Sequence, residues 1–255
     1  MALFVIVAGF GQGSLTPPPG PPAPTMKTLE QIEPRKPLAA GTNVDHTISS
    51  PGSYYLTGNV RRIAIDSSDV ILDLNGFPVV VDPGNPGFYA AVSVSGGVRR
   101  GNIVIKNGAI IGPVVPTYAG PNPWQYTFVD PFSWGIYVNV KSGGGDSNFG
   151  QNIRLEHVVV KDFSYGIWIA AFDEFDGGRI SVANCTVRDC SQVAMWFDHA
   201  TVRDCLIQRC GGDGLRVDLS TIENVIIERA GGHGITGNVN TIRNCILRFC
   251  GGNGI

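Results

Sequence analysis

A repeat of 20 residues constrains this chain more than any other feature of its sequence. The segments that begin at Thr201, Thr221 and Thr241 align without a gap, and each carries apolar residues at alternate positions before a Gly-Gly-x-Gly turn. A fixed period of this length is typical of a repeat architecture. Alternating apolar residues predict short strands and the glycines predict tight turns, which leaves no room for a helix in each repeat. We therefore predict that each repeat is one coil of a parallel β-helix.

The composition agrees with an all-β chain. The 255 residues are 43% hydrophobic and 16% charged, and they include 34 Gly and 17 Pro without a long amphipathic helical pattern. Parallel crossover connections are almost always right-handed, so the predicted fold is a single right-handed parallel β-helix with an N-terminal cap. The formal net charge of −2 lacks the basic excess of nucleic-acid-binding proteins, and no nucleic-acid partner is expected.

The chain divides into three parts. Residues 1–26 contain no charged side chain and combine a short apolar run with a Pro-rich stretch, which predicts a stiff linker. The apolar run is too short to span a bilayer and is similar to the core of a secretory signal without its basic start; a misassigned or truncated start explains it equally well. Residues 27–60 are expected to cap the β-helix of residues 61–255, which insertions interrupt at about 113–134 and 172–178.

These features predict a secreted or cell-surface protein without a transmembrane span. The sequence ends at Ile255, in the middle of a coil and without a capping segment. We expect either a fragment of a longer β-helix or a coil that another molecule covers, by oligomerisation or end-to-end stacking.

Six cysteines fall into two columns of the repeat. The columns are completed by Val225 and Ala230, which are residue types of a protein core, and the cysteines are Cys185, Cys205 and Cys245 in one column and Cys190, Cys210 and Cys250 in the other. Neighbouring coils are about 4.8 Å apart, which is wide for an unstrained disulfide. We predict free thiols packed in the core rather than disulfides or a metal site.

Segments near the N-terminus resemble a known group of proteins. These segments are Met26-Lys-Thr-Leu-Glu-Gln-Ile-Glu-Pro-Arg35, Pro51-Gly-Ser-Tyr-Tyr-Leu-Thr-Gly-Asn59 and Leu72-Asp-Leu-Asn-Gly-Phe77. With the repeats that follow, they resemble secreted bacterial parallel β-helix proteins that have no assigned activity. The resemblance covers nearly the whole chain and implies the fold, but it implies no function.

One strand of each coil carries a column of outward side chains. The alignment places Tyr137, Trp168, Trp196, Arg216 and Thr236 in this column, because side chains alternate between the two faces of a strand. Aromatic rings flanked by polar groups suit a polysaccharide, whose C–H faces stack on rings. The predicted substrate-binding residues are therefore Tyr137, Trp168 and Trp196, with Trp124 and Trp134 from the first insertion. The alternative is that this insertion folds over the rings and buries them.

Two carboxylates stand next to this column. Asp198 and Asp218 occupy the same position of adjacent coils, about 5 Å apart by strand spacing, and a pair at this range can share a proton and act as acid and base. With Arg216 they are the predicted catalytic residues, in an arrangement similar to the polygalacturonases. The Asn-Thr-Asp and Arg-Ile-Lys motifs of that family are absent. His233 is interpreted as a turn residue, and His199 is predicted to point inward because its column contains Leu219.

Uronate lyases of the same fold use Ca²⁺ held by Asp. The acidic segment with Asp173, Glu174 and Asp176 is a weak candidate for such a site, and a solvated acidic loop is the simpler interpretation. Asp204, Asn224 and Asn244 form a column that predicts a hydrogen-bonded turn ladder. The expected function is binding of an acidic polysaccharide, extended to cleavage if the protein is a hydrolase or lyase. The alternative is a non-catalytic structural or adhesive repeat protein.

Overall fold

The computed structural model describes residues 34–81, 89–95, 100–118, 126–129, 132–139, 151–170, 179–238 and 240–255. All regular secondary structure in these ranges is β-strand, and nearly all strand pairs are parallel, which confirms the all-β prediction. Among these residues no helix is long and apolar enough to cross a membrane. The strands belong to one unit, Arg35–Ile255, and the description below concerns that unit.

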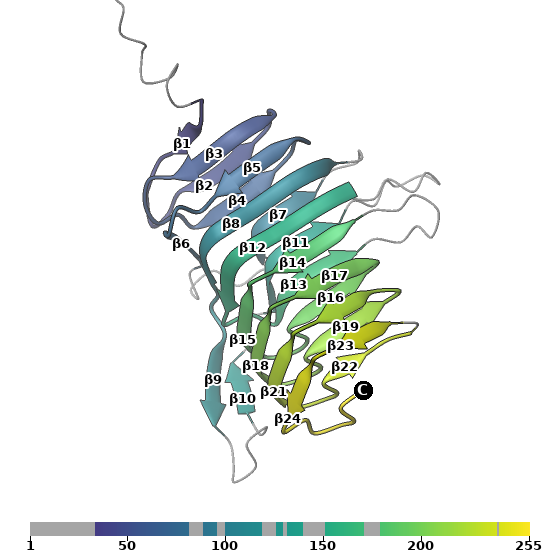
Figure 1. Ribbon diagram of the computed structural model, residues 1–255. Helices are drawn as coiled ribbons and strands as arrows, with labels where there is room; N and C mark the ends of the chain where they lie inside the picture. Colours follow the sequence, from purple (N-terminus) through teal and green to yellow (C-terminus); the bar gives the residue numbers. More distant parts are fainter. Residues whose placement is uncertain are drawn as a thin grey trace, which may run out of the picture. The chain divides into compact units, whose positions relative to one another are not determined.

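The chain passes repeatedly through three strand positions, here named face one, face two and face three (Figure 1). Face one contains β1 (Lys36–Leu38), β3 (Gly52–Leu56), β5 (Val70–Asp73), the first half of β8 (Gly101–Ile111) and of β12 (Gln151–Lys161), β14 (Ile180–Ala183), β17 (Ala200–Arg203), β20 (Thr221–Glu223) and β23 (Thr241–Arg243). Face two contains β6 (Pro78–Val80), the second halves of β8 and β12, β15 (Thr186–Cys190), β18 (Leu206–Cys210), β21 (Ile226–Ala230) and β24 (Ile246–Arg248).

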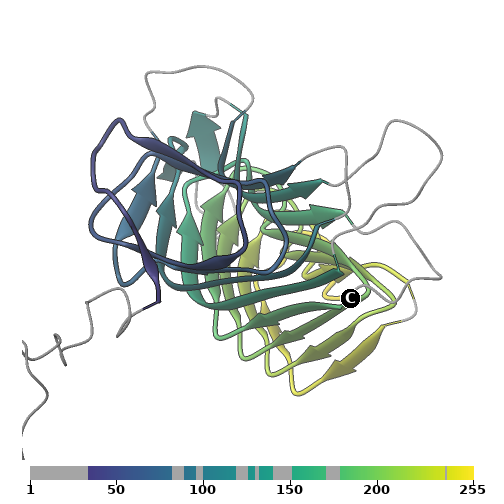
Figure 2. The same cartoon turned by 90° about the horizontal axis from the view of Figure 1, so that it is seen from above.

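Face three is a separate eight-stranded sheet. It contains β2 (Asp45–Ile48), β4 (Arg62–Ile65), β7 (Tyr89–Ser95), β11 (Ser133–Asn139), β13 (Tyr165–Ala170), β16 (Met195–Asp198), β19 (Leu215–Asp218) and β22 (Ile235–Thr236). The three faces enclose one core, and each strand pairs with its counterpart in the next repeat (Figure 2). In the regular part, Thr201 pairs with Thr221 and Thr221 with Thr241. This arrangement is compatible with a β-helix-like solenoid.

The core follows directly from the alternating sequence. Inward residues from all three faces, such as Ile105, Ile110 and Phe197, are completely buried, whereas their strand neighbours are partly exposed. Burial of one such side chain stabilises the fold by about 1.5–3 kcal/mol, so stacked columns of Ile, Val and Leu are the main source of stability.

The cysteines occupy the core columns that the sequence predicted. All six are free thiols, four of them are buried, and Cys245 and Cys250 are half-buried. Val225 and Ala230, which complete the two columns, are fully buried. Burial raises the pKa of Cys190 and of Cys210, which keeps these thiols protonated and unreactive.

The turn between faces one and two has a left-handed residue in each repeat. Asn184, Asp204, Asn224 and Asn244 have φ between 52° and 55°, a conformation that Asn and Asp tolerate better than other residues with a Cβ. Asn224 Nδ2 donates to Asp204 Oδ1 at 3.0 Å across two repeats. The predicted turn is therefore confirmed at all four positions, and the predicted hydrogen bond along the stack is confirmed between Asp204 and Asn224.

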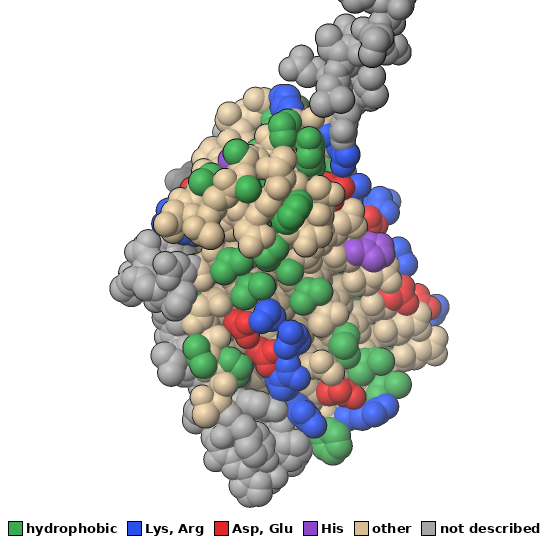
Figure 3. All heavy atoms as spheres, turned by 90° about the vertical axis from the view of Figure 1, so that its left-hand side faces the viewer, with side chains coloured by type: hydrophobic (Ala, Val, Ile, Leu, Met, Phe, Trp, Pro, Cys, Tyr) green, Lys and Arg blue, Asp and Glu red, His purple; other side chains and the backbone are tan. Residues whose placement is uncertain are grey.

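Face two carries paired charges at its far end. Arg209 donates from Nε and Nη2 to the two carboxylate oxygens of Asp189 at 2.5 Å and 2.7 Å, and Arg188 lies 2.9 Å from the same carboxylate. Lys161 pairs with Asp162 at 2.8 Å. Figure 3 shows a group of acidic and basic side chains with hydrophobic side chains beside it. Since the carboxylates form ion pairs with basic side chains of the same chain, we assign them a structural role at this turn.

The first insertion contains a hairpin. Strands β9 (Val115–Tyr118) and β10 (Tyr126–Val129) pair antiparallel and leave the chain between face two and face three. In Figure 1 the hairpin extends along β15 rather than across β13 and β16. The second insertion lies outside the described residues. Of the segment predicted as a cap, β1, β2 and β3 already pair within the two large sheets.

Candidate functional site

The outward column of face three has the predicted register. Tyr137 pairs with Trp168, Trp168 with Trp196, Trp196 with Arg216, and Arg216 with Thr236, on the consecutive strands β11, β13, β16, β19 and β22. The rings are half-buried, and Arg216 is exposed. Sequence reasoning therefore placed this column on the surface of one sheet correctly.

Two rings of this column, Trp168 and Trp196, stack on each other, whereas Tyr137 meets Trp168 edge-on. The Trp168 ring lies between Trp134 and Trp196, with centroid distances of 5.9 Å and 5.4 Å and interplanar angles of 24° and 23°. The guanidinium of Arg216 lies 4.3 Å from the centroid of Trp196. Ring faces used in this way stabilise one another, so a ligand on this column meets ring edges before it meets ring faces.

Trp134 lies deeper than expected. Its side chain is only 2% exposed, and Tyr165 stacks on it at 6.0 Å while Phe132 meets it edge-on at 4.9 Å. Phe132 itself is 46% exposed and has a φ of 58°. Trp134 thus supports Trp168 from within the stack. The sequence alignment did not place Phe132 and Tyr165 in the aromatic column, because both residues precede the aligned strand. Trp124 lies outside the described residues.

The predicted carboxylate pair stands in register at the end of this face. Asp198 on β16 pairs with Asp218 on β19. Burial, and next the charge of Asp218, raise the pKa of Asp198. Asp218 Oδ1 accepts hydrogen bonds from the Asn238 backbone N at 2.6 Å and from Asn238 Nδ2 at 3.2 Å. The two carboxyl groups therefore have different surroundings, as an acid and its partner base require.

The prediction that His199 points inward is wrong. His199 and Leu219 both have positive φ, at 53° and 50°, and Leu219 is 45% exposed, so their column lies at the corner between faces three and one. His199 Nδ1 is buried and makes no hydrogen bond within the described residues. A residue at a left-handed corner leaves the strand alternation on which the prediction relied.

His233 is a turn residue, as predicted. Its backbone N donates to Asp213 Oδ1 at 2.8 Å, and its Nδ1 accepts from the backbone N of Asn253 at 3.0 Å. Both contacts join equivalent positions of neighbouring repeats. The His233 ring therefore takes part in a row of hydrogen bonds between equivalent turn residues of neighbouring repeats.

The candidate Ca²⁺ ligands Asp173, Glu174 and Asp176 lie outside the described residues. Within the described ranges no group of three or more His, Cys, Asp or Glu side chains could hold a metal ion.

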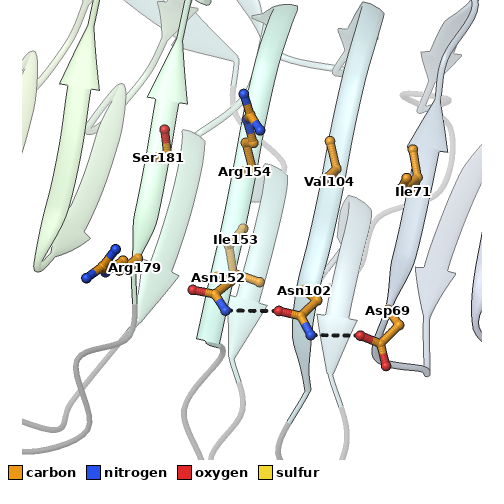
Figure 4. Close-up of a pocket in the computed structure, with 9 residues that line it drawn as sticks. All are labelled: Asp69, Ile71, Asn102, Val104, Asn152, Ile153, Arg154, Arg179 and Ser181. Atoms are coloured by element: carbon orange, nitrogen blue, oxygen red, sulfur yellow. Dashed lines mark hydrogen bonds between the residues drawn. The ribbon is translucent and has the colours of Figure 1, made fainter.

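A groove on the outer surface of face one was not predicted. It has a volume of about 640 Å³, and its lining residues come from four successive repeats: Asp69, Ile71, Asn102, Val104, Asn152, Ile153, Arg154, Arg179 and Ser181 (Figure 4). A second groove of about 520 Å³ shares Arg179 and Ser181 and continues to Thr201 and Thr221. The two grooves follow one surface from β5 to β20.

One wall of the groove is a hydrogen-bonded row of polar side chains. Asn102 Nδ2 donates to Asp69 Oδ1 at 2.7 Å, and Asn152 Nδ2 donates to Asn102 Oδ1 at 2.9 Å. The three residues have φ of 57° to 58°. The sequence feature that marks this row is an Asp or Asn directly before the first Val or Ile of each strand. These residues do not follow the 20-residue period, so the repeat did not reveal them.

The chain matches no protein-family model and no curated protein.

Proposed function

We propose that the chain is a right-handed parallel β-helix that binds an acidic polysaccharide outside the cell, at the cell surface or after secretion. The right-handed winding is supported by the general rule for parallel crossovers. The extracellular location is supported by the apolar start of the sequence and the Pro-rich stretch after it. A long row of equivalent strands offers a polymer the same contacts at regular intervals, which suits repeating sugars.

The observation that carries cleavage, the stronger form of this proposal, is the unequal carboxyl pair on face three. Asp198, whose pKa is raised, would hold a proton and act as the general acid, and Asp218, oriented by Asn238, would act as the base or nucleophile. Arg216 next to them would hold the carboxylate of a uronate unit. A lyase would instead use Arg216 as the base.

The second candidate function is that of a stiff structural or adhesive rod. It is favoured by side chains that pair along the stack with equivalents in the next repeat, as Trp168 does with Trp196 and Asn224 with Asp204. Such ladders stabilise a rod without any ligand.

Incubation with uronate polymers and neutral glucans, with and without Ca²⁺, separates these functions. Retention on uronate polymers is expected, and new reducing ends or unsaturated products would establish cleavage. Asp198→Asn and Asp218→Asn should abolish cleavage, whereas Asp204→Asn, on a different corner, should leave it unchanged. If the protein neither binds nor cleaves any of these polymers, the structural or adhesive function is favoured.

A further inference from the structure

The groove on face one differs from the aromatic column in being open. The two hollows of about 640 Å³ and 520 Å³ share Arg179 and Ser181, so they adjoin across successive strands, and together they are named the channel. Its floor is a single outward column, because Ile71 pairs with Val104, Val104 with Arg154, and Arg154 with Ser181. The channel therefore runs along the stack, across the strands, in the direction that an extended polymer would take.

The floor changes character along the channel. At the β5 end it is apolar, with Ile71 40% exposed and Val104 half-buried beside it. At the other end the same column continues with the hydroxyl groups of Ser181, Thr201 and Thr221. Sugar rings have apolar C–H faces and polar edges, and both parts of this floor match them.

The wall of the channel is fixed before any ligand binds. Asp69, Asn102 and Asn152 are held to one another by hydrogen bonds, and all three are exposed or lie at the rim. Figure 4 shows the side-chain oxygen of Asn152 turned away from Asn102, toward the repeat that carries Arg179. A wall that is already ordered loses little conformational entropy when it binds.

Two arginines favour an anionic ligand at the end of the channel away from the Asp69 carboxylate. Arg154 and Arg179 lie on adjacent repeats, since Arg154 pairs with Ser181 and Asn152 is opposite Arg179. Arg154 donates from Nε to Glu156 at 2.6 Å, and its side chain is 56% exposed. Arg179 is exposed. A guanidinium recognises a carboxylate through paired N–H donors, which an uncharged sugar cannot accept as strongly.

We propose that this channel is a binding subsite for a carboxylated polysaccharide, with carboxylates of neighbouring sugar units on Arg154 and Arg179 and sugar rings over Ile71 and Val104. The inference rests on the proposed function and adds a location to it: the polymer is held on face one, away from the carboxyl pair on face three.

Titration of the full chain with an oligogalacturonate tests the subsite. Loss of one charge-assisted contact should weaken binding about tenfold, so the double variant Arg154→Gln/Arg179→Gln should raise the Kd about 100-fold. The matched control is Arg203→Gln/Arg243→Gln, which removes two exposed arginines of the same face outside the channel; its Kd should change less than about twofold. Ile71→Glu should also weaken binding, and Thr241→Glu, in the same column beyond the channel, should not.

The outcomes separate the subsite from the proposed function. If the wild-type chain binds the oligogalacturonate and both channel variants bind it equally well, the subsite is wrong and the proposed function stands. Loss of binding only in Trp196→Ala or Asp218→Asn would then place the polymer on face three. If the wild-type chain binds no uronate oligomer, both proposals fail. Weaker binding in the channel variants with unchanged thermal unfolding supports the subsite.

Discussion

The repeats before and after Arg179 differ in length, and their surfaces differ accordingly. In the groove, Asn102 follows Asp69 by 33 residues and Asn152 follows Asn102 by 50 residues, whereas Asn224 follows Asp204 by 20 residues. Where the period is 20 residues, equivalent side chains such as Asp204 and Asn224 pair along the stack. Where inserted residues lengthen the repeats, the strands remain in register but the rim positions diversify. Regular repetition therefore builds most of the scaffold, and the longer repeats supply most of the channel that we propose as a binding subsite.

The largest expected effect concerns the regular repeats. A Cβ at Gly214 would lie 2.6 Å from Ile227 Cγ2 and 2.8 Å from the carbonyl oxygen of Gly234, so the corner has no space for a side chain. We expect Gly214→Ala to lower the free energy of unfolding by about 1–3 kcal/mol, which denaturant titration measures. Gly254→Ala is the matched control, because a Cβ there meets nothing closer than Leu247 Cδ1 at 3.6 Å. Equal losses in the two variants would contradict this explanation.

An intermediate effect concerns the aromatic column. Trp196→Ala removes the stack on Trp168 and the cation–π contact with Arg216, two contacts that together should contribute about 1–2 kcal/mol to stability. If the column is structural, thermal unfolding shifts while the Kd for an oligogalacturonate stays unchanged. Arg216→Gln removes only the cation and should have a smaller effect on stability. A large loss of binding without a loss of stability would show that the column contacts the ligand.

The sequence contained most of the fold because its period is a physical constraint. A 20-residue step with alternating apolar residues requires parallel strands in register, and this alone placed the thiols of Cys185 and Cys205 in the core and Asn224 above Asp204. The same alternation put Tyr137, Trp168 and Trp196 on the outside of face three.

The parts that escaped prediction are those where alternation or period fails. His199 and Leu219 adopt a left-handed backbone at a corner, so counting along the strand assigned them the wrong side. The depth of Trp134 depends on Phe132 and Tyr165, which precede the aligned strand. The groove brings together Asp69 and Arg179, which no local pattern connects. The alignment also does not show that the rings stack on one another instead of presenting open faces, because that depends on side-chain packing.

The smallest expected effect is a pH dependence at the carboxyl pair. Burial and Asp218 raise the pKa of Asp198 above its ordinary value of 3.8, so between these two values the folded chain binds more protons than the unfolded chain. The contribution of Asp198 to stability is therefore fully present below about pH 3.8 and is lost as the pH rises through its folded-state pKa. Asp198→Asn should remove this loss and unfold at a higher denaturant concentration than wild type at neutral pH, but not at low pH.

Because the Asp198 side chain is only half-buried, solvent screening keeps the difference small. Denaturant titrations from about pH 3 to about pH 8 measure it, with Asp204→Asn as the control. If the unfolding midpoint of the wild-type chain rises relative to that of Asp198→Asn as the pH increases, the pKa of Asp198 is not raised in the folded chain. The acid role assigned to Asp198 would then lose its basis.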